Sequence, residues 1–260
     1  MMRNSVGLRM AVGCILVFML APIVVVMATS VTTTAYPTFP PRGFTLRWFQ
    51  QYLESETFMA STRLSFGVAL CTAMLAGMLG TLAAVGLDRP GLLGRDILSS
   101  ILMSPAVFPA IVLGIAILTF YHAVGLSGTL AGIVAAHVLV TVPFVIRMVG
   151  ASLARLDPTL QEAAQNLGAG RMRVFFRVTF PLIRPGVAAG AICAFLLSFD
   201  ELVITLFIAG PGHETLPVRV FSYLEYTSDP MVAAISTAFT LLTLCLGLPL
   251  YLLLMPKTVR

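Results

Sequence analysis

Long uncharged stretches of apolar residues alternate with short polar segments along almost the whole chain. A helix that spans a bilayer needs about 20 predominantly apolar residues. Six segments meet this requirement, namely residues 10–31, 64–87, 97–121, 129–146, 182–209 and 231–255. The pattern therefore predicts an all-α membrane protein with six transmembrane helices, in which residues 1–260 form a single transmembrane domain.

The composition agrees with this prediction. Hydrophobic residues make up 58% of the chain, charged residues make up only 10%, and the mean hydropathy is +0.96. Soluble domains average about 25% charged residues, so a water-soluble fold is excluded. The basic residues are spread through connecting segments and form no dense block, which argues against nucleic acid as a partner.

The distribution of positive charge predicts the orientation in the membrane. If the N-terminus is cytoplasmic, twelve of the sixteen Lys and Arg residues fall on the cytoplasmic side. Cytoplasmic loops carry such an excess, so both termini are predicted to be cytoplasmic. The first apolar run is longer than the core of about 7–15 residues in a secretory signal, and we interpret it as a retained helix.

One polar, Arg-rich island interrupts the apolar pattern at about residues 151–181. Asp157 followed by Pro158 is typical of a helix start, with Asp as the N-cap and Pro at the first helical position. Gly168 is placed to end this helix in a left-handed conformation. A second short helix is predicted over residues 171–179, and Pro181 is expected to stop it before the fifth span.

The island is suited to contact another protein. Ala163 and Ala164 keep one face of the predicted helix slim, and Glu162 offers a carboxylate to a partner. From the residues alone, an ordinary amphipathic connecting loop remains an equal alternative.

A resemblance favours the first interpretation. Glu-Ala-Ala at 162–164, Gly168 six positions after the Glu, and Pro181 thirteen positions after the Gly resemble the cytoplasmic loop of type I ABC importer permeases. In that family the loop is a coupling helix that fits into a cleft of the ATPase. Where the family usually has Ile-x-Leu-Pro, this chain has Val-Thr-Phe-Pro at 178–181. The coupling residues implied here are Asp157, Glu162, Ala163, Ala164, Gly168 and Pro181.

The resemblance also implies the surroundings of the chain. It implies a bacterial inner-membrane permease that pairs with a second, homologous or identical permease. Two ATPase subunits and a periplasmic or lipid-anchored solute-binding protein would complete the importer, which works by alternating access. The single lysine, Lys257, follows no Gly-x-x-x-x-Gly-Lys motif, so ATP and Mg²⁺ are expected on the partner ATPase. We expect no cofactor, metal site or catalytic residue in this chain.

An acidic pair, Asp200 and Glu201, interrupts the fifth predicted span just after Ser198. A charge inside a span costs about 2.5–3.5 kcal/mol on insertion scales, so it usually faces a cavity or a partner. Adjacent residues of a helix differ by about 100°, so only one carboxylate is expected to face the pathway. These three residues are the candidate substrate pathway for a cation. A structural ion pair or a helix-break cap is the alternative.

The stretch 198–217 resembles the permeases of the spermidine/putrescine group, which implies a small, polyamine-like cation as the solute. Related permeases carry other solutes, including opines and phosphonates, so these remain alternatives.

Two rival functions are open to a chain of this kind. An ion- or proton-coupled secondary transporter would use the acidic pair as its proton site, and ATP dependence of uptake distinguishes it. An intramembrane enzyme would need a set of catalytic residues within the spans, such as a Ser with a His or two aspartates on facing helices. The two adjacent carboxylates of the acidic pair have poor geometry for such a dyad.

For His122 and His137, a hydrogen bond from a buried imidazole to a backbone carbonyl is favoured over proton relay or metal binding. Gly186 and Gly190 fit close helix packing.

Overall fold

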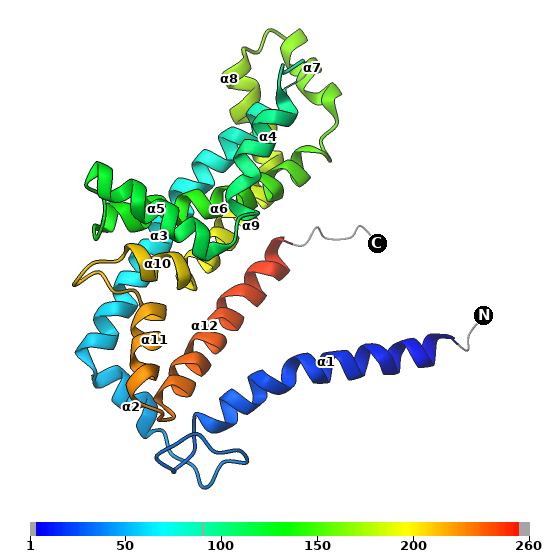
Figure 1. Cartoon of the computed structure of the whole chain (residues 1–260). Helices are drawn as coiled ribbons and strands as arrows, with labels where there is room; N and C mark the ends of the chain where they lie inside the picture. The colour runs from blue at the N-terminus through cyan, green and yellow to red at the C-terminus, as the bar shows by residue number, and fades with distance from the viewer. Residues whose placement is uncertain (1–3, 90, 255–260) are drawn as a thin grey trace. The chain divides into compact units, whose positions relative to one another are not determined.

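The computed structural model describes residues 4–89 and 91–254, and side-chain surroundings for 7–89 and 91–244 (Figure 1). The described residues form helices and connecting turns, without a strand among them, which confirms the all-α class. The chain divides into two compact units, unit 1 (Met1–Ala60 and Val220–Arg260) and unit 2 (Ser61–Arg219). Each is described separately.

In unit 1, the last helix contacts two of the other helices. Its elements are α1 (Asn4–Thr29), α2 (Arg47–Glu54), the start of α3 (Glu56–Leu87), the end of α11 (Leu216–Tyr226) and α12 (Met231–Leu254). Both α1 and α2 pack on α12. Trp48 and Tyr52 of α2 are buried, and the Trp48 indole N–H donates to the Thr32 carbonyl at 2.9 Å. Rings of Tyr52, Phe58 and Tyr223 meet edge to face.

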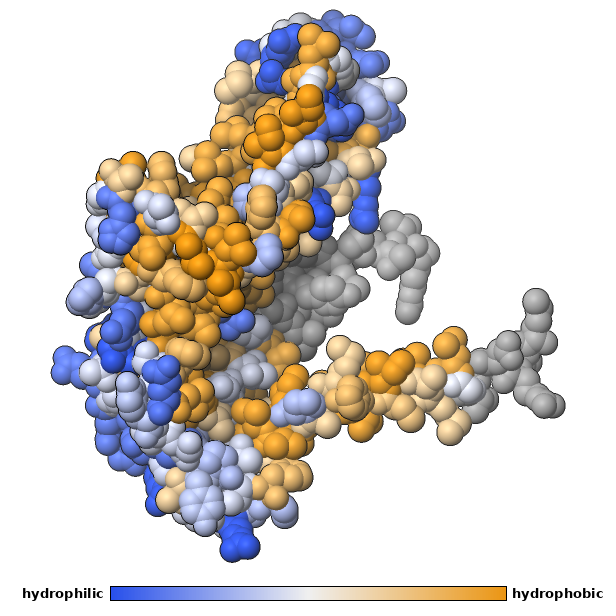
Figure 2. Space-filling model, viewed as in Figure 1, coloured by the Kyte–Doolittle hydropathy of each residue, from blue (hydrophilic) through white to orange (hydrophobic). Residues whose placement is uncertain are grey.

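The helix α1 exposes apolar side chains on every side. Between Leu8 and Val26 its large hydrophobic residues are mostly exposed, with Phe18 at 81%. Figure 2 shows this helix with an orange surface. A helix that is hydrophobic all round belongs in an apolar environment, so this surface requires lipid or another membrane helix.

Unit 2 contains the rest of the chain. Its elements are the remainder of α3, α4 (Arg95–Met103), η1 (Ser104–Ala106), α5 (Ala110–Val124), α6 (Leu130–Leu153), α7 (Pro158–Asn166), α8 (Arg171–Val174), η2 (Phe175–Thr179), α9 (Phe180–Phe199), α10 (Val203–Ile208) and the start of α11. The most extensive contact is between α6 and α9, and α10 packs on α5. In Figure 1, α7 and α8 form one end of this unit, away from α10.

Glycines allow the three long helices of unit 2 to cross closely at Val145 of α6, which is fully buried. A Cβ placed on Gly190 of α9 would lie 3.0 Å from Val145 Cγ1, and one placed on Gly80 of α3 would lie 2.6 Å from Val145 Cβ. A Cβ on Gly186 would meet Ser152 and the Met148 carbonyl. The close packing predicted at Gly186 and Gly190 is thus confirmed, because small residues let helix backbones approach.

The described residues contain fewer long apolar helices than the six spans predicted. Among the described residues, four helices are long and apolar enough to cross a bilayer: α1, α3, α6 and the continuous helix from Arg171 to Phe199. A fifth crossing is obtained if α4 and α5 count as one broken span. In α12 the apolar part with described side chains, Met231–Leu244, is shorter, and the rest of the predicted sixth span lies outside them.

The prediction of one continuous helix over residues 97–121 is wrong. The segments Arg95–Ala106 and Ala110–Val124 meet at a bend of 98°. Pro105 lies in the 3-10 turn η1, and Pro109 is the extended N-cap of α5. Proline lacks the N–H of the helix ladder, and its ring disfavours a helical conformation at the preceding residue, so two prolines four residues apart break the span. The fourth span also differs, because α6 continues to Leu153 instead of ending near 146.

Candidate functional site

The first helix of the polar island begins as the sequence predicts. The Asp157 carboxylate accepts a hydrogen bond from the Thr159 backbone N–H at 3.0 Å, and Pro158 is the first helical residue of α7. This backbone hydrogen bond lowers the pKa of the Asp157 carboxyl below its usual value. A carboxylate at this position also interacts favourably with the positive end of the helix dipole. The start of α7 is therefore held in place by its own N-cap.

The end of α7 depends on the conformation of Gly168. Its φ is +81°, the left-handed conformation expected of it. Its N–H donates to the Gln165 carbonyl at 2.9 Å, and the N–H of Ala169 donates to the Ala164 carbonyl at 3.0 Å. These bonds satisfy carbonyls that a helix end leaves open. Both ends of α7 are thus capped, the start by the Asp157 side chain and the end by the backbone conformation of Gly168.

The surface of α7 and α8 is exposed and partly apolar. Glu162 and Ala163 are exposed, and Ala164 is half-buried. Figure 2 shows this end of unit 2 as blue atoms interrupted by orange ones. The apolar members are Leu160, Leu167, Met172 and Phe176, exposed by 48%, 89%, 69% and 58%. Sequence reasoning missed these residues, although the spacing of Met172 and Phe176 places both on one helix face, opposite the buried Val174.

Pro181 does not stop the second short helix, and that prediction is wrong. Helix α8 continues through the π-turn η2 into α9, so one helix runs from Arg171 to Phe199. The Phe180 N–H bonds to the Phe175 carbonyl, five residues earlier. Proline tolerates the first turn of a helix but clashes with the carbonyl four residues before it in a regular one. The wider π-turn before Pro181 accommodates this ring, because such turns insert an extra residue.

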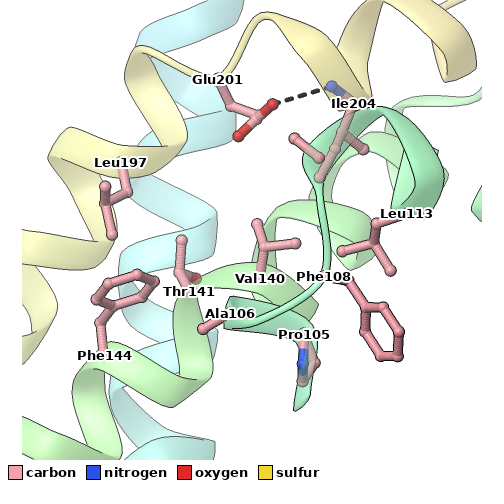
Figure 3. A pocket seen from close by; sticks show the side chains of 11 residues that line it. Pro105, Ala106, Phe108, Leu113, Val140, Thr141, Phe144, Leu197, Glu201 and Ile204 are labelled. Atoms are coloured by element: carbon pink, nitrogen blue, oxygen red, sulfur yellow. Dashed lines mark hydrogen bonds between the residues drawn. The ribbon is translucent and has the colours of Figure 1, made fainter. Parts of the chain in front are cut away.

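A cavity of about 160 Å³ lies between η1, α5, α6, α9 and α10 (Figure 3). Its lining is apolar, with Phe108 and Phe144 among the side chains drawn around it. The hydroxyl of Thr141 donates to the His137 carbonyl of its own helix at 2.8 Å. Glu201 is the charged residue in the described lining.

The carboxylate of Glu201 has two surroundings. One oxygen accepts a hydrogen bond from the Ile204 backbone N–H at 2.9 Å, and the other is directed toward the cavity (Figure 3). The first contact caps the start of α10, as in the predicted alternative of a helix-break cap. Within the described residues neither carboxylate of the acidic pair is bonded to a basic side chain, and the ion pair present joins Arg219 and Glu214.

The acidic pair is not inside a continuous helix, which corrects the prediction for the fifth span. Helix α9 ends at Phe199, and α10 begins only at Val203. Asp200 is exposed and does not line the cavity, whereas Glu201 is half-buried beside it. A carboxylate in the break avoids the cost of an unpaired charge in a regular helix, because free backbone N–H groups are available to it.

Ser198 and His122 are placed differently from expectation, whereas His137 is buried as predicted. Ser198 is buried and does not line the cavity, because its hydroxyl faces His137 Nδ1 at 2.8 Å. His137 is fully buried, as predicted, and its ring nitrogens contact the hydroxyls of Ser198 and Thr205, with a further interaction at the Ser198 backbone. His122 is exposed at the end of α5, so the expectation of a buried imidazole is wrong there. No group of three His, Cys, Asp or Glu side chains within the described residues is arranged to hold a metal ion.

Long apolar helices, a cavity with one carboxylate in an otherwise apolar lining, and an exposed capped helix outside the spans are features expected of a transmembrane transport subunit. The chain belongs to the family of binding-protein-dependent transport system inner membrane components, whose model matches residues 76–255. It is therefore a multi-pass inner-membrane permease subunit of an ATP-driven ABC importer. Permeases of this family work with a partner permease, an ATPase that binds the nucleotide, and a solute-binding protein.

Curated relatives from several transport systems resemble the chain over most of its length. The putrescine transport permease PotI of Escherichia coli K12 is 36% identical over 202 residues, covering 75% of this chain and 72% of the relative. The spermidine/putrescine permease PotC of the same organism is 28% identical, covering 93% and 91%. A putative 2-aminoethylphosphonate permease, PhnV of Salmonella typhimurium, is 28% identical, covering 90% and 89%.

Solved structures share the fold. A bacterial ABC transporter that imports the acidic polysaccharide alginate matches with a TM-score of 0.73 at 15% identity, covering 98% of this chain and 96% of that one. The inward-facing methionine transporter MetNI matches with a TM-score of 0.60 at 20% identity, covering 77% and 97%. At these identities the likeness concerns the fold alone.

Proposed function

We propose that this permease conducts a small, polyamine-like cation into the cytoplasm, and that Glu201 provides the negative charge in its path. The observation that carries the proposal is a carboxylate oxygen directed into an otherwise apolar cavity. Such a group attracts an ammonium ion, and the rings of Phe108 and Phe144 offer faces for cation–π contact. The names of the PotI and PotC relatives support the same class of solute.

The size of the cavity supports a site shared between two chains. A ligand pocket usually has a volume of about 300–1,000 Å³, well above the volume found here. In the proposed assembly a second permease, identical or homologous, completes the pathway. Asp200 and Ser198 belong to it indirectly: Asp200 is exposed beside the break, and Ser198 acts through its contact with His137.

The rest of the proposal concerns the assembly. Residues 1–260 act as one transmembrane permease domain with both termini in the cytoplasm. Two ATPase subunits bind the cytoplasmic loop at about 151–181, and a periplasmic or lipid-anchored protein delivers the solute. The chain itself performs no chemistry and binds no cofactor, metal or nucleic acid. The coupling residues are those that the sequence pattern selects, Asp157, Glu162, Ala163, Ala164, Gly168 and Pro181, joined by the exposed Leu167 and Met172.

Glu201→Gln tests the proposed solute. The amide oxygen of Gln still accepts the Ile204 N–H, so the cap of α10 is kept while the charge is removed. We expect ATP-driven putrescine uptake by the complete complex in proteoliposomes to fall at least about tenfold, which corresponds to about 1.4 kcal/mol. Asp200→Asn is the matched control, since it removes the same charge one residue away from the cavity, and it should reduce uptake less. Wild-type uptake by Glu201→Gln means that Glu201 is only a cap.

The orientation is tested by single cysteines in a chain whose four native cysteines are replaced. Cysteines at the exposed positions Gln50 and Glu225 should react with an impermeant maleimide added from the periplasm. A cysteine at the exposed position Gln165 should react only after the membrane is opened. Labelling of the position 165 cysteine from the periplasm would contradict the proposed orientation, and α7 could then not be a cytoplasmic coupling helix.

A second solute class is favoured by one observation. The PhnV relative covers 90% of this chain and is named for 2-aminoethylphosphonate, which also carries an ammonium group. Competition of putrescine, spermidine and 2-aminoethylphosphonate for uptake by the same complex distinguishes the two classes. Uptake that requires ATP and survives an uncoupler excludes the proton-coupled alternative.

A further inference from the structure

The imidazole of His137 joins α6 to both sides of the break between α9 and α10. Its Nδ1 lies 2.8 Å from the hydroxyl oxygen of Ser198, in the last turn of α9. Its Nε2 lies 2.8 Å from the hydroxyl oxygen of Thr205, in the first turn of α10. All three residues are buried, with His137 and Thr205 at 0% exposure. The two bonds therefore bracket the residues 200–202, which include Glu201.

The direction of these hydrogen bonds follows from a third one. The Thr205 hydroxyl donates its hydrogen to the Glu201 carbonyl at 3.0 Å. With its hydrogen used in this way, the hydroxyl accepts a hydrogen bond from His137, so Nε2 carries the proton. The unprotonated Nδ1 then accepts a hydrogen bond from the Ser198 hydroxyl. Each polar atom of the group has a partner, which makes a chain of hydrogen bonds from α9 through α6 to the backbone of Glu201.

The short helix α10 needs such external support. It has six residues, too few to form a stable helix alone because the first turn is costly to nucleate. Its apolar residues Ile204 and Ile208 are buried in a cluster with Ile117 and Ile133. This packing fixes the side of α10 that faces the core, but apolar contacts are not directional. The His137–Thr205 bond adds a directional contact one turn from Glu201.

We propose that His137 is a positioning residue for Glu201: by bonding Ser198 and Thr205 it holds the α9–α10 break in the geometry that directs the Glu201 carboxylate into the cavity. The inference rests on the proposed role of Glu201 as the negative charge in the cation path. It assigns to His137 no contact with solute and no change of protonation. It also explains why Ser198 matters to the pathway without lining the cavity.

The first test uses Thr205, because replacing a fully buried histidine can prevent folding. Thr205→Val keeps the side-chain shape and removes the hydroxyl, and Thr205→Ser restores the hydroxyl. The substitution to Val removes both bonds of this hydroxyl, the one with His137 and the one to the Glu201 carbonyl. In proteoliposomes that contain the complete complex and its binding protein, we therefore expect Thr205→Val to lower putrescine uptake per ATP hydrolysed at least about fivefold, the order that the loss of a single buried hydrogen bond produces. Thr205→Ser should return this ratio close to the wild-type value. A merely structural role would lower the amount of assembled complex and leave the ratio unchanged.

The second test asks whether His137 acts through Glu201. His137→Gln keeps an amide group that reaches one of the two hydroxyls, and His137→Leu keeps neither bond. We expect uptake per ATP to decrease from wild type to His137→Gln to His137→Leu. In the Glu201→Gln background, His137→Leu should add little further loss, because interacting positions are not additive.

The outcomes separate the two proposals. If Glu201→Gln alone lowers uptake but the Thr205 and His137 variants leave uptake per ATP unchanged, the positioning role is overturned and the proposed function stands. If Glu201→Gln has no effect on uptake, the proposed role of Glu201 in the cation path is overturned, and the positioning role of His137 that rests on it is overturned as well. Additive losses in the double variant also overturn the inference, because His137 would then act independently of Glu201.

Discussion

Replacing Ala163 by Trp is expected to stop ATP-driven uptake while the chain remains folded in the membrane. Ala163 is exposed on α7, so the indole ring can extend into solvent without displacing a buried residue. In the proposed assembly the ring occupies the space where the ATPase approaches the slim face of the helix. We expect uptake to fall at least about tenfold, since each 1.4 kcal/mol of lost docking energy is a factor of ten. Two measurements check this: ATP-driven uptake by proteoliposomes in which the permease has a known orientation, and co-purification of the ATPase with the permease.

Gln165→Trp is the control for this substitution, because it adds the same ring to an exposed position on another side of α7. It should preserve uptake better than Ala163→Trp. Normal ATP-driven uptake by Ala163→Trp would exclude α7 as the coupling helix.

Gly168→Val tests the same helix through its backbone. The φ of Gly168 is +81°, and nothing lies within 4 Å of the position that its Cβ would take. A cost for Val therefore comes from the left-handed conformation, about 1–2 kcal/mol or more for a residue with a Cβ. Gly170→Val is the matched control, since Gly170 is equally open but has an ordinary φ of −65°. Loss of coupling in Gly168→Val alone indicates that the end of α7 must be held as it is; equal behaviour of both variants contradicts this.

A Leu in place of Gly190 is expected to prevent assembly of unit 2. The first added carbon would already be 3.0 Å from Val145 Cγ1 and 3.2 Å from its Cα. Overpacking a core typically costs about 1–3 kcal/mol, occasionally more, and three more carbons have no space at this crossing of α6 and α9. We expect most of the folded complex to be lost in fluorescence-detected size-exclusion chromatography, together with a lower Tm for what remains.

Two comparisons isolate the steric cause. Gly67→Leu adds the same side chain to an open helical position, where nothing lies within 4 Å of the added Cβ, and it should be tolerated. Gly190→Ala should be milder than Gly190→Leu, and it should be partly rescued by Val145→Ala, which removes the nearest carbon. A Gly190→Leu chain as stable as the Gly67→Leu chain would mean that the helices separate more easily than this crossing indicates.

Several features follow from short-range chemistry, and the sequence was sufficient for them. The apolar runs and the low content of charged residues determine an all-α membrane protein, because backbone groups in lipid must bond within their own segment. The start of α7 at Asp157 and Pro158 and its end at Gly168 depend on side chains and φ preferences within a few residues. The motif of the polar island also indicated the family, which the match over residues 76–255 supports.

Helix continuity depended on how prolines are accommodated, and the sequence pattern alone did not determine this. Pro105 and Pro109 break one predicted span by 98°, whereas Pro181 lies in a helix that continues through a π-turn. Both outcomes avoid the clash of the proline ring with the carbonyl four residues earlier and accommodate the hydrogen bond that proline cannot donate. The choice between them is made by what packs around the freed backbone groups, which is tertiary information.

The acidic pair shows most clearly what tertiary structure decided. The sequence marked Asp200 and Glu201 as costly in a span, and it predicted that they would face different surroundings. Only the break between α9 and α10 determines that Glu201 faces the cavity while Asp200 is exposed. The link from Ser198 to His137, 61 residues earlier, has no local signal at all. Its physical reason is that a buried imidazole needs a partner for each ring nitrogen, and only folding brings two hydroxyls from separate segments to it.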